Sequence, residues 1–559
     1  NFSGGEVRIY FDEFVELRDL RQQLLISPPL QTNPEVRIRG RSIVFSVDED
    51  LRQNTTYSIF FGDAIRDITE GNPIPNFQFV FSTGDYVDSL SVSGSVVDAF
   101  TLEPAEGVYV MMYDSIVDSI PYLERPVYLA KTGAEGRFLI GNIREGAYLI
   151  FGLVDNNANF LYDLPDEKIA FLDSLVRPRY LEPPPAPDPD AGEEEDPREG
   201  EETREPAEGP GAPTPPVREQ SARETAEGPG APGDTTALPP ELPGSLSLFL
   251  FQEADTVQRI TSSEAVSTGR IRIVFRVPFD SLHFRDVRQE LPDHWHLAEE
   301  SPGRDTLTLW LPEPRPDSLF LEISDRDHIL DTLNLSTRPR QARARAGEEE
   351  ITDPAPARVQ LAMSALRGGR WPYYEPLSLM ASAPVDSLDL SRITLVQNDS
   401  ISLEPGFVFD GPVQRSFRLD FELEEEQAYA IEFLPGAVTD IFGGTNDTIR
   451  RSFTTTAESD YGKLFMNIEL PQKEQVYILQ LLDKDGNILQ EKPANESRVY
   501  RFADLNPGSY GLRLIEDLNN NGKWDPGIYL KGLLPEPVYM YPGPLQIRQN
   551  WELEMPWKP

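Results

Sequence analysis

The sequence predicts an all-β chain of tandem β-sandwiches, and two kinds of internal repeat carry this prediction. Three stretches open on the same apolar strand pattern, at residues 7–11, 271–275 and 377–381, and each continues at the same offset into a second apolar pair. The same stretches close alike, on Phe81-Ser82-Thr83, Leu335-Ser336-Thr337 and Phe453-Thr454-Thr455. Self-similarity at domain-sized intervals indicates a repeated structural unit, which is typical of a scaffold or a binding array.

The composition limits the classes of function. The chain has 559 residues and 39% hydrophobic content, which is room for four or five domains of about 100 residues each. It contains no cysteine, so disulfides, thiolate metal sites and cysteine nucleophiles are excluded. The net charge of −42 argues against nucleic-acid binding, and against docking on anionic lipid by overall charge. No apolar run is long enough for a transmembrane helix.

Residues 1–86 are predicted to form the first sandwich. Val7 and Ile9 alternate with Arg8 and Tyr10, and residues 36–39 and 43–45 indicate a hairpin. Alternation with a period of two places one face of a strand in a core and the other in water, as in an antiparallel sandwich. Residues 246–338 and 356–458 carry the same opening and closing motifs, so we expect two further sandwiches of this kind there.

A second kind of sandwich is expected at residues 87–180 and again at 459–559. The two copies are offset by 362 residues, and four positions of the first copy recur in the second with unchanged spacing. These pairs are Phe138 and Tyr500, Gly146 and Gly508, Tyr148 and Tyr510, and Asp155 and Asp517.

Two segments are predicted to be linkers. Residues 181–245 hold 17 acidic residues against four arginines, and they repeat the heptapeptide Ala-Glu-Gly-Pro-Gly-Ala-Pro. Such a segment cannot bury enough apolar surface to offset its chain entropy, so we predict a long disordered acidic linker. Residues 339–355 form a shorter linker. The long linker would separate a front of two domains from a rear of three.

A candidate calcium loop follows Asp517 in the second copy, with the spacing of an EF-hand-type loop and a glycine at its turn position. Its candidate ligands are Asp517, Asn519, Asn521, Lys523 and Asp525. In such loops, alternate oxygens converge on one hard cation. Ile528 stands where these loops have a bidentate glutamate, so the match is incomplete.

The first copy keeps the oxygen spacing of this loop. Its candidate ligands are Asp155, Asn157, Asn159 and Asp163, but Phe160 replaces the turn glycine and is poorly suited to positive φ. The alternative for both loops is an Asx-rich turn whose side chains bond their own backbone. Under either interpretation the loop stiffens the rim of a sandwich, and calcium is the one cofactor we expect.

Catalytic patterns are scarce in the sequence. His294 and His296 would share one face of a strand, and His283 and His328 lie in the same stretch, so a zinc or copper site is one interpretation. The other is two polar residues in a surface loop. No Gly-x-Ser-x-Gly elbow, P-loop or dinucleotide fingerprint occurs. We therefore predict that the protein is not an enzyme, with a metal-dependent enzyme as an alternative.

The first module also resembles a known family. Its stretch 7–15 is joined by Ile26-Ser27-Pro28-Pro29-Leu30, Asn54-Thr55-Thr56-Tyr57 and Phe81-Ser82-Thr83-Gly84-Asp85. Together these resemble the SbsA-type Ig-like domain that opens a family of Bacteroidota outer-membrane lipoproteins. The second kind of module is similar to transthyretin-like or carboxypeptidase-regulatory sandwiches. The resemblance implies an outer-membrane address and a lipid anchor upstream of Asn1, and it supplies no catalytic residues.

Asp-Ser and Asp-Thr pairs, nearly always followed by an aliphatic residue, are unusually frequent. One explanation is turn chemistry, in which the pair starts a turn and the aliphatic residue begins the next strand. The triplet also resembles the O-glycosylation signal of exported Bacteroidota proteins. The candidate acceptors are Ser89, Ser115, Ser119, Ser174, Thr256, Ser281, Thr306, Ser318, Thr332, Ser387, Ser400 and Thr448.

These observations predict a non-catalytic surface lipoprotein, anchored at the outer membrane, that serves as a scaffold or interaction subunit of an outer-membrane protein complex. β-Barrel assembly or protein export machinery would be the setting, and a β-barrel and other lipoproteins would be the partners; no nucleic acid or small-molecule substrate is expected. The alternative is a calcium-stiffened glycan-binding or adhesive protein. Its sugar platforms would be Trp371, Tyr373, Tyr374 and Trp524.

Overall fold

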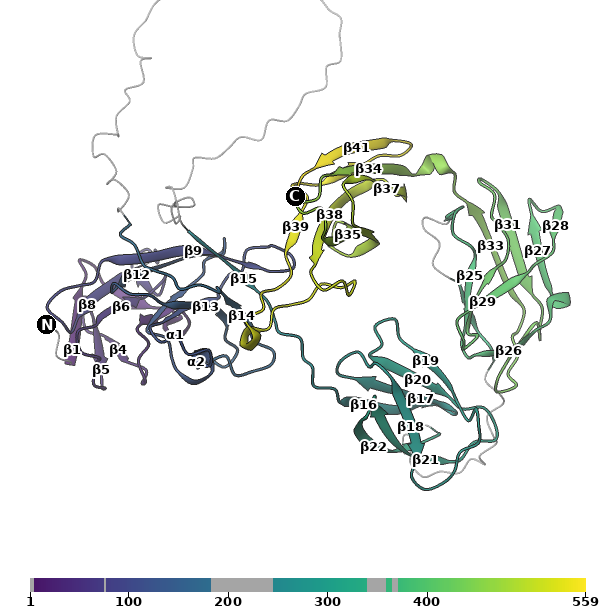
Figure 1. Ribbon diagram of the computed structural model, residues 1–559, viewed down its shortest axis with the longest axis horizontal. Helices are drawn as coiled ribbons and strands as arrows, with labels where there is room; N and C mark the ends of the chain where they lie inside the picture. Colours follow the sequence, from purple (N-terminus) through teal and green to yellow (C-terminus); the bar gives the residue numbers. More distant parts are fainter. Residues whose placement is uncertain (1–4, 75–76, 182–244, 339–357, 364–369) are drawn as a thin grey trace, which may run out of the picture. The chain divides into compact units, whose positions relative to one another are not determined.

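The computed structural model describes residues 5–74, 77–181, 245–338, 358–363 and 370–559, and these are almost entirely β-strands and loops (Figure 1). They form sandwiches arranged in series, which confirms the predicted all-β tandem architecture. The chain divides into two compact units, one of Asn1–Glu253 with Pro526–Pro535 and one of Ala254–Asp525 with Glu536–Pro559. No helix in the described residues is both long and apolar enough to span a bilayer.

The first module has the sheets β1-β5-β4 and β3-β6-β8 and the strand pair β2-β7. Its elements are β1 Gly5–Tyr10, β2 Val15–Leu17, α1 Leu20–Gln23, β3 Leu25–Ser27, β4 Glu35–Ile38, β5 Ser42–Val47, β6 Thr56–Phe60, β7 Ile65–Asp67 and β8 Gln78–Ser82. Val7 and Ile9 are buried in the core while Arg8 and Tyr10 are exposed, as the alternation predicts. The predicted hairpin is β4-β5.

The second module pairs the sheet β12-β9-β15 with the sheet β11-β10-β13-β14 around one core. Its elements are β9 Leu90–Asp98, β10 Tyr109–Tyr113, α2 Ile120–Leu123, β11 Tyr128–Lys131, β12 Arg137–Ile143, β13 Leu149–Val154, β14 Lys168–Phe171 and β15 Leu246–Leu250.

The position of β15 corrects two of the predicted boundaries. β15 runs parallel to β9, with Leu246 opposite Gly94 and Leu250 opposite Asp98, and the side chains of Leu248 and Leu250 lie in the core of the second module. Residues 246–250 therefore complete the second module and do not start the third. The acidic segment consequently joins two parts of one sandwich, whereas the sequence predicted that it links two groups of domains. The sequence of β15 does not reveal this pairing, because a short apolar strand can join either the preceding or the following sheet.

The predictions of disorder fall outside the described residues. Residues 182–244 and 339–357 are not described, so the disordered character of the two predicted linkers stays a prediction.

The third module has the sheets β16-β17-β20-β19 and β18-β21-β22. Its strands are β16 Ile260–Ser267, β17 Arg270–Phe275, β18 Leu282–Asp286, β19 Leu297–Glu300, β20 Thr306–Trp310, β21 Ser318–Asp325 and β22 His328–Ser336.

The fourth module has the sheets β23-β25-β30-β29 and β24-β33-β31-β27-β28 and the pair β26-β32. Its elements are β23 Leu361–Met363, β24 Arg370–Trp371, β25 Ser378–Ala381, β26 Val385–Leu388, η1 Leu390–Arg392, β27 Ile393–Gln397, β28 Ile401–Leu403, β29 Phe407–Asp410, β30 Ser416–Leu419, β31 Ala428–Phe433, β32 Val438–Asp440 and β33 Ile449–Thr455.

The fifth module repeats the plan of the second, with β37-β34-β41 facing β36-β35-β38-β39 and β40 paired to β38. Its elements are η2 Glu458–Asp460, β34 Gly462–Ile468, β35 Val476–Leu482, β36 Ile488–Ala494, β37 Arg498–Leu505, β38 Gly508–Asp517, β39 Val538–Met540, β40 Leu545–Ile547 and β41 Glu552–Trp557. The last strand, β41, runs parallel to β34, just as β15 runs parallel to β9.

The repeated closing motif of the Ig-type modules has a common structural role. The hydroxyl of Thr83 donates to the carbonyl of Arg52 at 2.7 Å, that of Thr337 to Pro316 at 2.7 Å, and that of Thr455 to Glu424 at 2.6 Å. In each module the last strand is thus fastened to a loop that lies far from it in sequence. Such a side-chain hydrogen bond satisfies a loop carbonyl that has no partner in a strand ladder. This explains why the motif recurs.

Residues Pro526–Pro535 belong to the first unit, although they follow β38 in the sequence. They contain the short helix η3 Tyr529–Lys531. The ring of Tyr529 lies edge-on to Phe151 and Phe171, with centroids 5.2 and 5.1 Å away, and its hydroxyl donates to the carbonyl of Asp118. Tyr529 is therefore a buried anchor in the first unit.

Candidate functional site

The predicted calcium loop of the fifth module follows directly from β38. Asp517 is almost fully buried, and its two carboxylate oxygens accept the backbone N–H groups of Asn521 at 3.0 Å and Gly522 at 2.8 Å. The side-chain amides of Asn519 and Asn521 both donate to Asp525. The predicted residues therefore do converge, because the strand end and the turn at Gly522, with φ of 74°, fold them into one loop. Lys523 joins them through its backbone N–H, which donates to Asn521.

A buried glutamate closes this loop. Glu536 accepts the N–H of Leu518 on one oxygen at 2.8 Å and the N–H of Asp525 on the other at 3.0 Å. Burial raises the pKa of Glu536, and the nearby carboxylates of Asp525 and Asp517 raise it further. The loop thus concentrates negative charge around a carboxyl group with little access to water.

The first copy of the loop has the same construction. Asp155 accepts the N–H groups of Asn157, Ala158 and Phe160. The side-chain amides of Asn157 and Asn159 both donate to the carboxylate of Asp163, at 3.0 and 2.9 Å. Phe160 adopts φ of 62°, although a side chain there was expected to be unsuitable, and its ring packs edge-on against Tyr109 at 5.2 Å. Packing of the ring offsets the backbone strain.

Glu167 closes the first loop and was missed by the sequence analysis, as was Glu536. Glu167 is fully buried and accepts the N–H groups of Asn156, Asp163 and Leu164 at 3.0 to 3.2 Å. It lies four residues after Asp163, whereas Glu536 lies eleven after Asp525. Aligning the copies with a seven-residue insertion, at the segment that carries Tyr529, would have revealed the pair.

The geometry of both loops matches the Asx-turn interpretation, since each acidic or amide oxygen named above accepts a backbone N–H or a side-chain amide. Across the described ranges, no group of three or more His, Cys, Asp or Glu side chains is placed to hold a metal ion. Calcium binding, which would also use amide and backbone oxygens, stays a prediction.

The histidine pair is not assembled into a shared site. His294 lies in a turn with φ of 61°, and the ring of His296 packs against Trp295 at a tilt of 44°, with centroids 3.9 Å apart. Burial lowers the pKa of His296. The contact of His296 with Trp295 is one of side-chain packing.

The aromatic candidates for sugar platforms lie in packed surroundings. Trp371 is 2% exposed in the core of the fourth module, and Trp524 donates its indole N–H to the carbonyl of Glu536. Tyr373 and Tyr374 both reach Asp504, whose side chain and carbonyl accept their hydroxyls. These four residues do not form one platform.

None of the twelve candidate glycosylation acceptors is buried. Eight are exposed, and Ser115, Ser119, Thr306 and Ser318 are half-buried. Several precede or begin a strand, such as Ser89 before β9, Ser281 before β18 and Thr448 before β33. This placement agrees with the turn chemistry that the triplet predicts; glycosylation itself stays a prediction.

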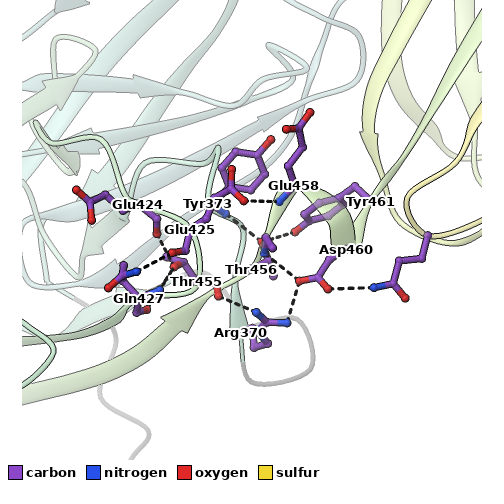
Figure 2. A network of polar contacts seen from close by, with 12 residues as sticks. Arg370, Tyr373, Glu424, Glu425, Gln427, Thr455, Thr456, Glu458, Asp460 and Tyr461 are labelled. Atoms are coloured by element: carbon purple, nitrogen blue, oxygen red, sulfur yellow. Dashed lines mark hydrogen bonds and ion pairs between the residues drawn. The ribbon is translucent and has the colours of Figure 1, made fainter.

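A polar network fixes the passage of the chain from the fourth to the fifth module (Figure 2). Arg370 donates to the carboxylate of Asp460 at 2.8 Å and to the carbonyl of Thr455 at 3.0 Å. The same oxygen of Asp460 accepts the N–H of Ala457 at 2.9 Å. Glu458 donates its N–H to Glu425 at 2.9 Å. Gln549 of the fifth module donates to the other oxygen of Asp460 at 3.3 Å, so the connecting residues are bonded to both modules they join.

Aromatic rings complete this junction. Tyr461 lies 5.2 Å from Tyr374 and 6.2 Å from Tyr373, centroid to centroid, and its hydroxyl is 2.9 Å from that of Thr456. Burial, with the adjacent Asp504 carboxylate, raises the pKa of Tyr373 to about 12. Tyr373 therefore stays protonated at neutral pH and donates its hydroxyl to Asp504, which is a structural role.

The third and fourth modules meet in a different way. Trp310, 1% exposed, packs with Ala383, Val413 and Phe442 of the fourth module. Its indole N–H donates to Glu299 at 2.8 Å, and Arg415 donates to the other oxygen of Glu299 at 2.6 Å. This junction combines an apolar anchor with a partly buried ion pair.

Comparison with known proteins identifies the N-terminal module. Residues 1–83 match the family model of a bacterial Ig-like domain. The predicted Ig-like character of that module is thus confirmed; the lipoprotein family to which the sequence was assigned by resemblance stays a prediction. No curated protein matches the sequence significantly.

Solved structures offer only distant similarity. The N-terminal part of the bacterial S-layer protein SbsC is 12% identical, over 26% of this chain and 39% of that one, with a TM-score of 0.16. A fragment of alpha-2-macroglobulin from Escherichia coli, spanning domains MG0-NIE-MG1, is 14% identical over 47% and 95%, with a TM-score of 0.18. The Bacteroides ovatus protein SGBP-B of a mixed-linkage glucan utilization locus is 8% identical over 83% and 94%, with a TM-score of 0.17. At these TM-scores the similarities carry no argument about function.

Proposed function

We propose that the protein is a non-catalytic scaffold of the bacterial envelope, which holds sandwich edges and loops in fixed positions for partner proteins. The observation that carries this proposal is the bonded junction between the fourth and fifth modules. Arg370 of the fourth module and Gln549 of the fifth donate to the two carboxylate oxygens of Asp460, whereas a loose string of independent domains would have a solvated linker. A second bonded junction, around Trp310, supports the same conclusion.

The first unit is built in the same manner. Thr56 of the first module donates to Asp88 at 2.8 Å, and Ser27 accepts the N–H of Leu129 of the second module at 2.9 Å. Fixed geometry between modules is what a scaffold requires, because a partner that contacts two modules gains affinity when their spacing is set in advance.

The finer proposal places this scaffold at the cell surface, anchored in the outer membrane by a lipid upstream of Asn1. Its partners are a β-barrel protein and other lipoproteins, in β-barrel assembly or protein export machinery. The motifs of residues 1–86 and the family match at residues 1–83 support the Ig-like module on which this resemblance depends.

Purification of the tagged protein from native membranes in mild detergent, followed by mass spectrometry, tests this function. We expect outer-membrane proteins to co-purify in constant ratio. The double substitution Tyr373→Ala and Tyr374→Ala should reduce their recovery, because it removes the ring contacts with Tyr461 and the hydrogen bonds to Asp504 that hold the junction. Arg450→Gln, which removes an exposed charge of β33, is the matched control. A protein that purifies alone would contradict the proposal.

We also propose that the loops after Asp155 and Asp517 bind calcium. Their repeated oxygen spacing and the concentration of carboxylates beside Glu536 support this. Calorimetric titration of the full chain should detect two sites, and Asp525→Asn should remove one of them while Asp386→Asn, an exposed control, removes neither. Absence of calcium-dependent heat or of any rise in melting temperature would refute calcium binding.

The Asp-Ser and Asp-Thr triplets are proposed as O-glycosylation sites, since every acceptor is at least partly accessible. Peptide mapping of protein from its native host should locate sugar on exposed acceptors such as Ser281. Unmodified peptides at all twelve acceptors would end this proposal.

A further inference from the structure

One outward face of the first module differs in charge from the rest of the chain. In the sheet β1-β5-β4, Arg8 and Arg37 both lie opposite Val44, so all three side chains share the face that points away from the core. Tyr10 lies opposite Ser42 on the same face, and Arg39 is joined to Ser42 by backbone hydrogen bonds. The register therefore gathers three arginines and one tyrosine on one sheet surface.

Two exposed aromatic rings lie at the end of β1 and just beyond it, by the turn between β4 and β5. Tyr10 is 73% exposed and Phe14 is 58% exposed, both unusually high for aromatic rings. The guanidinium of Arg41 lies 5.9 Å from the centre of the Phe14 ring and donates to the carbonyl of Asp12 at 2.8 Å. We call this set, made of Arg8, Tyr10, Phe14, Arg37, Arg39 and Arg41, the arginine–aromatic face.

The charges on this face are only partly compensated. Arg37 is paired with Glu35, and Glu6 lies on the same face, opposite Ser46 and near Arg37. No ion pair of Arg8 or Arg39 occurs in the part of the chain that the structure describes. In a chain of net charge −42, two arginines without an ion pair on one sheet face, Arg8 and Arg39, form a local exception.

We propose that the arginine–aromatic face docks on an anionic lipid surface, through its guanidinium groups on lipid phosphates and its two aromatic rings at the headgroup level. This inference rests on the proposed envelope location, which it deepens by assigning the membrane-facing side of the first module. Guanidinium groups suit phosphate because they donate two parallel hydrogen bonds. Exposed tyrosine and phenylalanine rings beside basic residues are typical of interfacial contact and distinguish a membrane from an acidic protein partner.

The large negative charge of the whole chain does not prevent such docking. At physiological ionic strength, charges farther than about 8 Å from the lipid are largely screened, so the nearest side chains decide the interaction. A single lipid chain gives only marginal anchoring, and a basic patch supplies the second contact that stable attachment needs. The face lies in the N-terminal module, next to the anchor proposed upstream of Asn1.

Vesicle sedimentation with the full chain, made without a lipid anchor, tests the inference. We expect binding to vesicles of phosphatidylcholine mixed with phosphatidylglycerol, weak binding to phosphatidylcholine alone, and loss of binding at high salt. The triple variant Arg8→Gln, Arg39→Gln and Arg41→Gln should bind on the order of 100-fold more weakly, from about fivefold per arginine near an anionic surface. The variant Tyr10→Ser with Phe14→Ser should also bind more weakly.

The matched control removes the same charge from another module. Arg272, Arg285 and Arg326 are exposed in the third module, and their joint replacement by glutamine should leave vesicle binding unchanged. The inference would be overturned if the parent chain sedimented equally with neutral and anionic vesicles. It would also be overturned if this control variant lost as much vesicle binding as the triple variant of the first module.

The two proposals fail separately. Co-purification of partners in detergent tests the scaffold, whereas vesicle binding uses no partner protein. If the arginine triple variant loses partner proteins in the detergent experiment while the parent chain ignores anionic vesicles, the face belongs to an acidic protein and the lipid assignment is wrong.

Discussion

The second and fifth modules are two copies of one sandwich, and their comparison separates what the fold requires from what it tolerates. Both pair a three-stranded sheet with a larger one, and both finish with a strand that runs parallel to the first. In both, a tyrosine hydroxyl donates to the carbonyl four residues earlier, Tyr148 to Arg144 and Tyr510 to Asn506. Sheet order, core and this local bond are therefore shared.

The connections differ between the copies. The second module interrupts its plan before the last strand, since the acidic segment lies between β14 and β15. The fifth module has its insertion between Asp525 and Glu536, where it carries Tyr529. Glu167 and Glu536 nevertheless accept the equivalent backbone N–H groups. The position of the buried carboxylate is kept in space while its distance in sequence changes, which indicates that the loop depends on it.

The substitution Glu167→Ala should have the largest effect among the tests of whether each loop depends on its buried carboxylate. Three backbone N–H groups, of Asn156, Asp163 and Leu164, would lose their acceptor in a buried site, so we expect a loss of about 4 kcal/mol in the stability of the second module. Hydrogen exchange of amides in β13 and β14 measures this for one module within the full chain.

Two further variants sharpen the comparison. Glu536→Ala removes an acceptor for two N–H groups and should cost the fifth module less, about 3 kcal/mol. Glu106→Ala changes an exposed glutamate of the second module and should have almost no effect. Equal exchange rates in Glu167→Ala and Glu106→Ala would show that the buried carboxylate is dispensable.

The insertion of the fifth module is tested by Tyr529→Ala. The ring contacts Phe151 and Phe171 and is nearly buried, so its removal leaves a cavity in the first unit and should cost about 3 kcal/mol. Hydrogen exchange should quicken in β13 and β14. The neighbouring Leu530 is 63% exposed, and Leu530→Ala should change little. Were both variants equally mild, Tyr529 would not be an anchor.

Much of this architecture could be predicted from the sequence, because it depends on local patterns. Period-two alternation gave β1, β17 and β25, and the offset of 362 residues gave the second copy with its loop.

The remainder depends on contacts that local patterns do not encode. Leu246–Leu250 looks like the start of a new module, and only its pairing with β9 assigns it to the preceding one. Glu536 was hidden by the insertion, and Trp310 resembles any core tryptophan until its contacts with Val413 and Phe442 are known. The strain at Phe160 was foreseen, but the ring of Tyr109 that compensates for it lies far away in sequence.

A pH titration distinguishes the two loops further. Burial and two nearby carboxylates raise the pKa of Glu536 in the folded state above its ordinary value of 4.5. The folded state then binds a proton more tightly than the unfolded state, so stability falls as the pH rises from about 4.5 through the raised pKa and is constant above it. Each unit of pKa difference corresponds to about 1.4 kcal/mol.

Denaturant unfolding of the fifth module as a function of pH measures how much the protonation of Glu536 contributes to stability. The decrease should be absent in Glu536→Gln, whose side chain does not titrate, and it should shrink in the parent chain when calcium is added, since a bound cation would stabilise the ionised form. An unchanged slope in Glu536→Gln would assign the pH dependence to other groups.

The smallest expected effect concerns the turn position that differs between the copies. Gly522 has φ of 74° and Phe160 has φ of 62°, and the residues two positions earlier, Asn520 and Ala158, also have positive φ. A Cβ at Gly522 would meet no atom within 4 Å, so Gly522→Ala should cost about 1 kcal/mol from backbone strain alone. Gly133→Ala, equally open but without positive φ, is the control and should be neutral.

The reciprocal change tests how the first copy tolerates its strained residue. Phe160→Gly relieves the positive φ but removes the ring that packs against Tyr109, so the two effects oppose each other and the net change should be smaller than the strain term at Gly522. Hydrogen exchange in the second and fifth modules measures the stability changes caused by Phe160→Gly and Gly522→Ala, and so compares them directly. A clear stabilisation by Phe160→Gly would mean that the ring contributes nothing, and the aromatic contact could then no longer explain why a loop of this shape survives without its glycine.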